Sequence, residues 1–210
     1  TFTTNSVETT VNIATGSSAE AAATAINNKT GDHGVTAQAQ TSLTLGLASA
    51  DGNVGFTLNG ETISATAVSK TNGDQSALAQ AINDKTSETG VTAAHADDGT
   101  IVLSNTTGAD INILSYVNST GGTASITPID SESNNGTPIT LTSGTINSAT
   151  VSGTLSLTSS KDFAVSGNTT HTTGVGADLQ TVDGIDLGTE TGAQSALAVI
   201  DGALAQIDSQ

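Results

Sequence analysis

Apolar and polar residues alternate in many short stretches of this chain, which is the pattern of half-buried β-strands. The apolar positions Val7, Val11 and Ile13 predict one or two strands within residues 1–14. Further strands are predicted at 35–40, 43–47, 56–58 and 62–63. From about 121 to 177, short alternating strands recur every 6 to 10 residues with glycines between them, and no helix is predicted there. The hydrophobic pattern therefore predicts a β-rich chain with few helices.

Two short helices interrupt this pattern. Ser17 and Glu20 form a Ser-x-x-Glu capping box ahead of an apolar run that includes Ile26, and Gly31 or Gly34 is expected to end that helix. Asp74 is expected to cap the second helix, whose apolar stripe consists of Leu78, Ala81 and Ile82.

The two helices belong to an internal repeat. The sequence AINNKTGDHGVTAQA at 25–39 aligns with AINDKTSETGVTAAH at 81–95, an offset of 56 residues. Asn59-Gly60 and Asp98-Gly99 predict hairpin turns before and after the second helix, and Asp183-Gly184 predicts a third. Each repeat is therefore interpreted as a hairpin, a helix and a second hairpin. Two copies are too few for a solenoid.

A third helix is predicted at the carboxy end, in segment 189–210. Its apolar residues recur at steps of four, three, four and three, which makes a heptad seam, and Thr191 with Gln194 forms a capping box. No glycine, proline or basic turn follows the seam. One interpretation is an ordinary amphipathic helix that covers a sheet. The other is the start of a longer helix whose helical partner lies outside this chain. The seam residues are Ala193, Leu197, Ile200, Leu204 and Ile207.

The composition favours several thin β-rich modules over one thick core. Hydrophobic residues make up 35% of the 210 residues and aromatic residues only 2%, with three Phe, one Tyr and no Trp. Small aliphatic side chains must therefore fill the interior. The fold class predicted is α+β and β-rich, with small antiparallel β modules and short helices on a helical stem fragment.

Charge excludes some partners. Four basic against 20 acidic residues give a formal net charge of −16, and no basic cluster occurs, so neither nucleic acid nor an anionic membrane surface is an expected partner. No apolar run is long enough to span a bilayer, and no signal peptide is recognised. The absence of Cys excludes thiol catalysis and Cys-ligated metals.

Candidate catalytic and metal-binding residues are scattered. His33, His95 and His171 lie far apart, and solvated loop or strand positions are the simpler interpretation for all three. A calcium turn at Gly174, Gly176 and Asp178 would need stacked copies that the chain lacks. Three further features have simpler explanations in turn chemistry or composition: Asp97-Asp98, Asp130 with Glu132, and the Asn-x-Ser/Thr sequons that begin at Asn105 and Asn118. No nucleophile elbow or phosphate loop occurs, so we predict no enzyme activity, no cofactor and no metal.

The repeated AIN(N/D)KT…GVTA sequence resembles the IN motif of bacterial flagellins and hook-associated proteins. The segment TGAQSALAVIDGALAQIDSQ at 191–210 closely resembles the start of the flagellin carboxy-terminal helix. This resemblance implies the exposed central portion of flagellin, a secreted, extracellular subunit of the flagellar filament that assembles through helices mostly absent from this chain. It also implies a homo-oligomer in the full-length protein, a monomer for this chain alone, and recognition by a host immune receptor or antibodies. O-linked sugars are a familiar modification of the family, but no residue is singled out here.

The resemblance also suggests a domain division. A stem is expected at 1–14 and 178–210, a middle β-rich domain at 15–50 and 137–177, and an outer IN-type domain at 51–136, in nested or tandem order. The seam residues of the carboxy-terminal helix are the expected assembly contacts. The alternatives are a hook-associated or filament-cap protein, which shares the IN motif, and a surface adhesin whose binding module would gather Phe56, Tyr116 and Phe163 in one patch.

Overall fold

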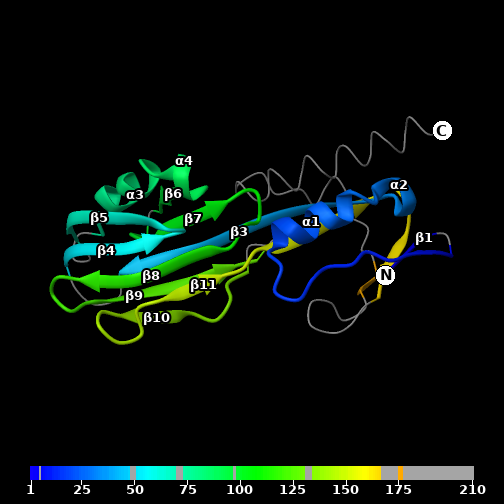
Figure 1. Ribbon diagram of the computed structural model, residues 1–210. Coiled ribbons are helices and arrows are strands. Elements are labelled where there is room, and N and C mark those ends of the chain that lie inside the picture. Colours follow the sequence, from blue (N-terminus) through cyan, green and yellow to red (C-terminus); the bar gives the residue numbers. More distant parts are fainter. Residues whose placement is uncertain are drawn as a thin grey trace. The chain divides into compact units, whose positions relative to one another are not determined.

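The structure is a computed structural model that describes residues 1–4, 6–47, 51–69, 73–96, 98–130, 134–166 and 175–176. These residues form short antiparallel strands and four short helices (Figure 1), which confirms the predicted β-rich α+β class. The chain divides into two compact units. Unit 1 comprises Thr1–Gln38 and Leu155–Gln210, and unit 2 comprises Ala39–Thr154. This division into two units does not test the three predicted domains, which stay a prediction.

Unit 1 contains a small four-stranded sheet with the order β14-β13-β1-β2. Strands β1 (Phe2–Thr4) and β2 (Val7–Thr9) form a hairpin, and β1 also pairs with β13 (Phe163–Val165), which pairs with β14 (Val175–Gly176). This pairing brings the first residues of the chain beside residues more than 150 positions later. Helices α1 (Ala19–Asn27) and α2 (Thr30–His33) also belong to unit 1.

The helix boundaries differ slightly from those expected. The N-cap of α1 is Ser18, whose hydroxyl accepts the Ala21 N–H at 3.3 Å, so the prediction of Ser17 was wrong by one position. Helix α1 ends before either predicted glycine. Gly34, at φ +70°, instead ends the single turn of α2. A left-handed residue of this kind suits glycine, because it lacks the Cβ that would clash there.

Unit 2 contains two sheets and the second pair of helices, α3 (Ser76–Asn83) and α4 (Thr86–Thr89). The first sheet has the order β11-β8-β4-β5. The second has the order β10-β9-β3-β7-β6, and β12 (Thr154–Ser159) also pairs with β3. Helix α3 packs against β5 and β6 (Figure 1). The strands of unit 2 are β4 (Gly52–Leu58), β5 (Glu61–Val68), β6 (Thr92–His95), β7 (Ile101–Asn105), β8 (Ile111–Asn118), β9 (Thr123–Ile129), β10 (Ile139–Thr142), β11 (Ala149–Val151) and most of β3 (Val35–Leu47).

One aliphatic core joins the sheets and helix α3 of unit 2. It includes Leu45, Leu58, Ile82 and Ile126, each at most 1% exposed, together with Tyr116. The inward residues alternate with outward Thr, Ser and Asn along β4 and β5, as the period of a β-strand requires. The predicted small-residue core is thus present in unit 2.

The hairpin predictions hold in unit 2. Asn59 and Gly60 connect β4 to β5 with φ values of +47° and +96°, and Leu58 pairs with Glu61. Two central residues with positive φ make the type I′ turn that Asn-Gly favours. The Asp98-Gly99 turn joins β6 to β7, where His95 pairs with Ile101. The predicted turn at Asp183-Gly184 lies outside the described residues.

The first repeat does not contain a second hairpin. Residues 35–47 form the single strand β3 instead of two strands at 35–40 and 43–47. The predicted break falls where Ser42 pairs with both Ser104 of β7 and Ile129 of β9, so partners on both sides keep the backbone extended. No glycine or proline occurs between residues 40 and 43 to favour a turn.

Candidate functional site

The two repeats build the same hydrogen-bonded unit, in which a helix end is tied to the strand that follows it. In unit 1, the Asn27 carboxamide donates to the Ala37 carbonyl and accepts the Ala37 N–H, both at 2.8 Å. In unit 2, Asn83 makes the same pair of bonds to Ala93, at 2.8 and 2.7 Å. Each carboxamide thus bonds to both the N–H and the carbonyl of one strand residue, as the backbone of a neighbouring strand does in a sheet.

The turn between the helix and the strand is also repeated. Thr30 donates its hydroxyl hydrogen to the Val35 carbonyl at 2.9 Å, and Thr86 donates to the Val91 carbonyl at 2.8 Å. Gly90 has the same φ of +70° as Gly34. The repeated Asn, Thr and Gly therefore define one helix–turn–strand unit, which occurs once in each of the two copies of the repeat.

The sequences of the two turns differ at three positions, and the difference between His33 and Thr89 changes the hydrogen bonding. The Val35 N–H donates to Nδ1 of His33 at 3.0 Å, whereas the Val91 N–H donates to the Thr89 hydroxyl at 3.2 Å. His33 is 2% exposed, and its ring stacks on Phe2 with centroids 4.6 Å apart. The prediction of a solvated histidine was therefore wrong for His33, because β1 covers the ring.

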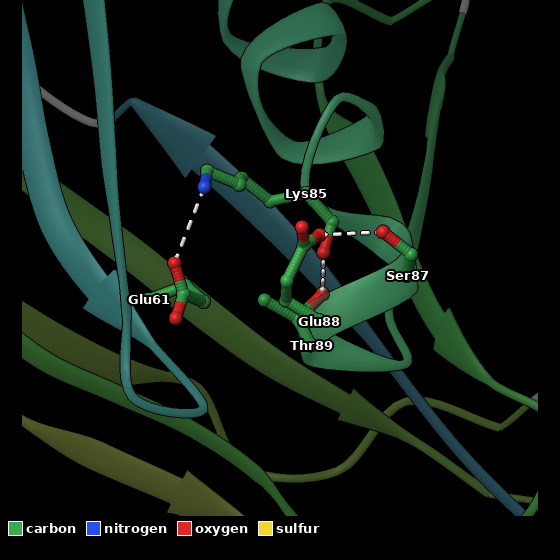
Figure 2. Close-up of polar contacts among 5 residues, drawn as sticks. All are labelled: Glu61, Lys85, Ser87, Glu88 and Thr89. Atoms are coloured by element: carbon green, nitrogen blue, oxygen red, sulfur yellow. Dashed lines mark hydrogen bonds and ion pairs between the residues drawn. The ribbon is translucent and has the colours of Figure 1, made fainter.

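Figure 2 shows the polar contacts around the second turn. Lys85 Nζ lies 3.3 Å from Glu61 Oε2, Ser87 donates to Glu88 Oε2 at 2.6 Å, and the Thr89 hydroxyl donates to the Lys85 carbonyl at 2.9 Å. The Lys85 and Glu61 side chains are 41% and 39% exposed, so solvent screens their ion pair and its contribution to stability is small. The hydrogen bond from Ser87 lowers the pKa of Glu88.

The hairpin turn of β4 and β5 is attached to this unit. The Asn59 carboxamide donates to the Thr89 carbonyl at 2.9 Å and accepts the Asn112 N–H at 2.8 Å. One side chain therefore links the hairpin, helix α4 and strand β8. This role of Asn59 adds to its turn geometry and was not predicted from the sequence.

Asp74 and Asp98 both act in turns. Asp74 does not take the N-cap position expected for it, which Gln75 occupies, but its carboxylate accepts the Ser76 N–H at 3.0 Å and the Ser76 hydroxyl at 2.6 Å. Asp98 makes the equivalent bonds to Thr100 at 3.0 and 2.6 Å. These hydroxyl and N–H donors lower the pKa of each carboxyl.

The remaining candidate residues form no catalytic group among the described residues. His95 is exposed, and its Nε2 lies 2.9 Å from the Gly73 carbonyl oxygen. Across the described ranges, no three His, Asp or Glu side chains gather where a metal ion could bind. Five residues considered for chemistry lie outside the described residues: Asp97, Glu132, His171, Gly174 and Asp178.

The predicted assembly contacts are likewise outside the described residues. Ala193, Leu197, Ile200, Leu204 and Ile207 all belong to segment 177–210. No helix among the described residues is long and apolar enough to cross a membrane.

The helix–turn–strand units and their hydrogen bonds define a structural β-rich module. Comparison with known proteins narrows this class: residues 55–107 match the model of the flagellin hook IN motif. The chain is also 29% identical over 212 residues to the B-type flagellin of Pseudomonas aeruginosa, an alignment that covers 94% of this chain. Together these findings confirm the predicted resemblance to bacterial flagellin. The chain spans 42% of the length of that relative.

Proposed function

We propose that this chain is the exposed central portion of a flagellin, the structural subunit of the bacterial flagellar filament. The observation that carries this proposal is the flagellin hook IN motif at 55–107, set within a flagellin similarity that covers 94% of the chain. The two helix–turn–strand units support a structural role, because their polar side chains bond to the protein's own backbone. The net charge of −16 suits an extracellular surface where many copies lie close together.

Under this proposal, the stem is 1–14 with 178–210, the middle domain is 15–50 with 137–177, and the outer IN-type domain is 51–136. The full-length protein forms a homo-oligomeric filament, and the present chain alone is a monomer. Antibodies and a host immune receptor are the expected recognition partners of the filament. The chain itself has no enzymatic role.

The assembly contacts are tested by Leu204→Asp in the full-length flagellin. Leu204 belongs to the predicted seam, and a carboxylate there would be desolvated on packing against another helix. Filaments should therefore be absent or much rarer by electron microscopy. The matched control is Gln206→Asp, because two residues place a side chain about 200° away around a helix. Normal filaments from Leu204→Asp would show that the seam residues are not assembly contacts.

The surface role of unit 2 is tested by deleting it from the full-length flagellin. Residues 39–154 form a compact unit, and the Thr36 hydroxyl lies 2.8 Å from that of Thr158, so the two ends of unit 1 are close enough for a short glycine-rich linker. The shortened protein should still be secreted and form filaments. Secreted subunits that do not polymerise would contradict the assignment of unit 2 to the exposed portion.

The adhesin alternative required its aromatic side chains to share one exposed patch. Phe56 and Tyr116 are instead 3% and 1% exposed and belong to the core of unit 2, and Phe163 lies on β13 of unit 1. Phe56 and Tyr116 thus serve packing, which favours the filament subunit over a sugar-binding module.

A further inference from the structure

Three large apolar side chains of unit 2 stay exposed to solvent, and all three lie on or beside strand β8. Leu114 and Val117 of β8 are 42% and 50% exposed, and Ile146 is 65% exposed. Ile146 directly precedes Asn147, whose carbonyl accepts the Tyr116 N–H of β8 at 2.8 Å. Leu114, Val117 and Ile146 are called the β8 patch below. Among the described residues of unit 2, exposed large apolar side chains are confined to this patch.

A β-bulge turns two of these side chains toward the same face of the sheet. Strand β8 lies beside β4 (Figure 1), where Val117 pairs with Gly55 and Leu114 with Thr57. Between these pairs β8 contains one residue more than β4, and Ser115 there has a φ of +56°, which is uncommon for a residue with a Cβ. Residues three apart in a regular strand face opposite sides. The bulge instead directs both side chains outward, away from the core of unit 2.

Packing within the chain accounts for only part of the patch. Val117 lies over Gly55, because a Cβ atom placed on Gly55 would be 3.3 Å from Val117 Cγ2. Half of the Val117 side chain nevertheless stays exposed. Apolar side chains that gather on one exposed face are typical of a contact surface, whereas isolated ones need no explanation.

The sheet that carries the patch is almost free of charge. Glu61 is the only charged residue in strands β4, β5, β8 and β11, and its carboxylate pairs with Lys85 at 3.3 Å. From residue 111 to 160 the sequence has only two charged residues, Asp130 and Glu132, although the whole chain has 20 acidic and four basic residues. Copies with a net charge of −16 repel one another. An uncharged face is where two such copies can touch with the least repulsion.

We propose that the β8 patch is a contact surface between copies of this chain, in which the patch of one copy packs on the patch of another. Since the described part of unit 2 offers one apolar patch, both copies use the same residues, as in an isologous dimer. A strongly charged macromolecule would find no charged partner in these strands other than the paired Glu61. Phe56 and Tyr116 are buried, so they present no ring to a sugar.

The contact is weak, because three side chains bury much less than the roughly 1,200 Å² at which stable interfaces begin. The chain is therefore a monomer when dilute. Linked copies reach effective concentrations on the order of millimolar, and a filament would crowd them in this way. The role of the contact in a filament thus rests on the proposed function, whereas the contact itself can be measured on the 210-residue chain.

The first test is sedimentation equilibrium of the 210-residue chain from micromolar to millimolar concentration. Dimers should appear at the upper end and increase with salt, because salt screens the repulsion between acidic copies. Leu114→Asp should raise the dissociation constant at least about tenfold, since it removes an apolar contact and adds a carboxylate that must lose water. The control Gln80→Glu adds the same charge at an exposed position of α3 and should have little effect. A chain that stays monomeric at millimolar concentration and high salt would overturn the proposal, as would equal dissociation constants for the two variants.

The second test locates the contact without adding a charge. The chain has no Cys, so Val117→Cys and Gln80→Cys each introduce a single thiol. At millimolar concentration, a short bis-maleimide should link copies of Val117→Cys much faster than copies of Gln80→Cys. In dilute solution, both thiols should react equally well with a simple maleimide. Equal rates of linking would refute the contact, and a protected thiol in dilute Val117→Cys would show that the same chain covers the patch. Filament formation is scored separately by electron microscopy, so a failure of the contact is distinguishable from a failure of the filament role.

Discussion

Gly108 lies where the chain comes very close to strand β3. It lies between β7 and β8 with φ +81°, and a Cβ atom placed on it would lie 2.3 Å from the Ala39 Cβ. The same atom would lie 3.0 Å from the Ala39 carbonyl carbon and 3.1 Å from its Cα. Gly108→Ala should therefore carry two separate costs, one from the backbone conformation and one from the close approach to β3.

Gly144 serves as a control that should carry only the cost from the backbone conformation. Its φ is +84°, but a Cβ there would meet no atom within 4 Å. Gly144→Ala should lose about 1–2 kcal/mol from the left-handed conformation. It should regain about 0.4–1 kcal/mol from the smaller entropy of the unfolded chain. Gly108→Ala should cost about 1–3 kcal/mol more than this control, which is the usual range for overpacking.

Urea denaturation followed by tyrosine fluorescence measures both variants. Tyr116 is the single tyrosine of a chain without tryptophan, and it is buried in the core of unit 2. Equal m-values would show that the same transition is compared. Ala39→Gly combined with Gly108→Ala should recover only part of the loss, because the contacts at 3.0 and 3.1 Å involve backbone atoms. Free energies of unfolding for Gly108→Ala and Gly144→Ala that agree within about 0.5 kcal/mol would refute the close-approach argument.

Two further predictions concern polar groups of unit 2. Asn83→Asp replaces the Nδ2 donor with an oxygen that faces the Ala93 carbonyl, so it should destabilise the unit by about 0.5–1.5 kcal/mol in the same urea assay. Asp84→Asn, at the next position and equally exposed, serves as the control. Equal stabilities for the two variants would contradict a stabilising role for the hydrogen bonds between Asn83 and Ala93. Burial raises the pKa of Tyr116, so the native state keeps the phenol proton above the ordinary tyrosine value of about 10 and stability falls as the pH rises past that value. Tyr116→Phe should remove this part of the fall between pH 10 and 12, measured by circular dichroism, and an unchanged slope would show that the phenol is not its source.

Elements whose signals are local were predictable from the sequence. The Asn59-Gly60 turn needs only two residues with positive φ between alternating strands, and the structure has that geometry. Gly34 and Gly90 mark the ends of the repeated turns for the same reason. Helices α1 and α3 were predicted in the right places, although the predicted cap of each was one residue off. The single turns α2 and α4 were not predicted, and the helix predicted at 189–210 lies outside the described residues.

Features that depend on distant residues were not predictable in this way. The break expected between residues 40 and 43 is absent because β7 and β9 pair with the strand there. The burial of His33 depends on Phe2, which is 31 positions away. The paired hydrogen bonds that Asn27 and Asn83 make to the backbone require the following strand to return beside the helix. The repeated Asn of the AIN sequence was the available signal, but its bonding partner could not be identified from spacing.

The abundance of Asn, Asp, Ser and Thr has a structural explanation that extends beyond the two repeats. The side-chain oxygen of Asn105 accepts the N–H and the hydroxyl of Thr107 at 2.9 and 2.8 Å, and Asn118 does the same with Thr120 at 2.9 and 2.7 Å. Asp74 and Asp98 repeat this geometry two residues ahead of a Ser or Thr. An Asx residue followed two positions later by a hydroxyl residue thus forms a turn from its own side chains. The Asn-x-Thr sequons at 105 and 118 are accounted for in this way, since both Asn side chains are buried, at 3% and 5% exposure. A chain with few aromatic residues can therefore define its many short strands through the turns between them, and its polar composition need not indicate a binding surface.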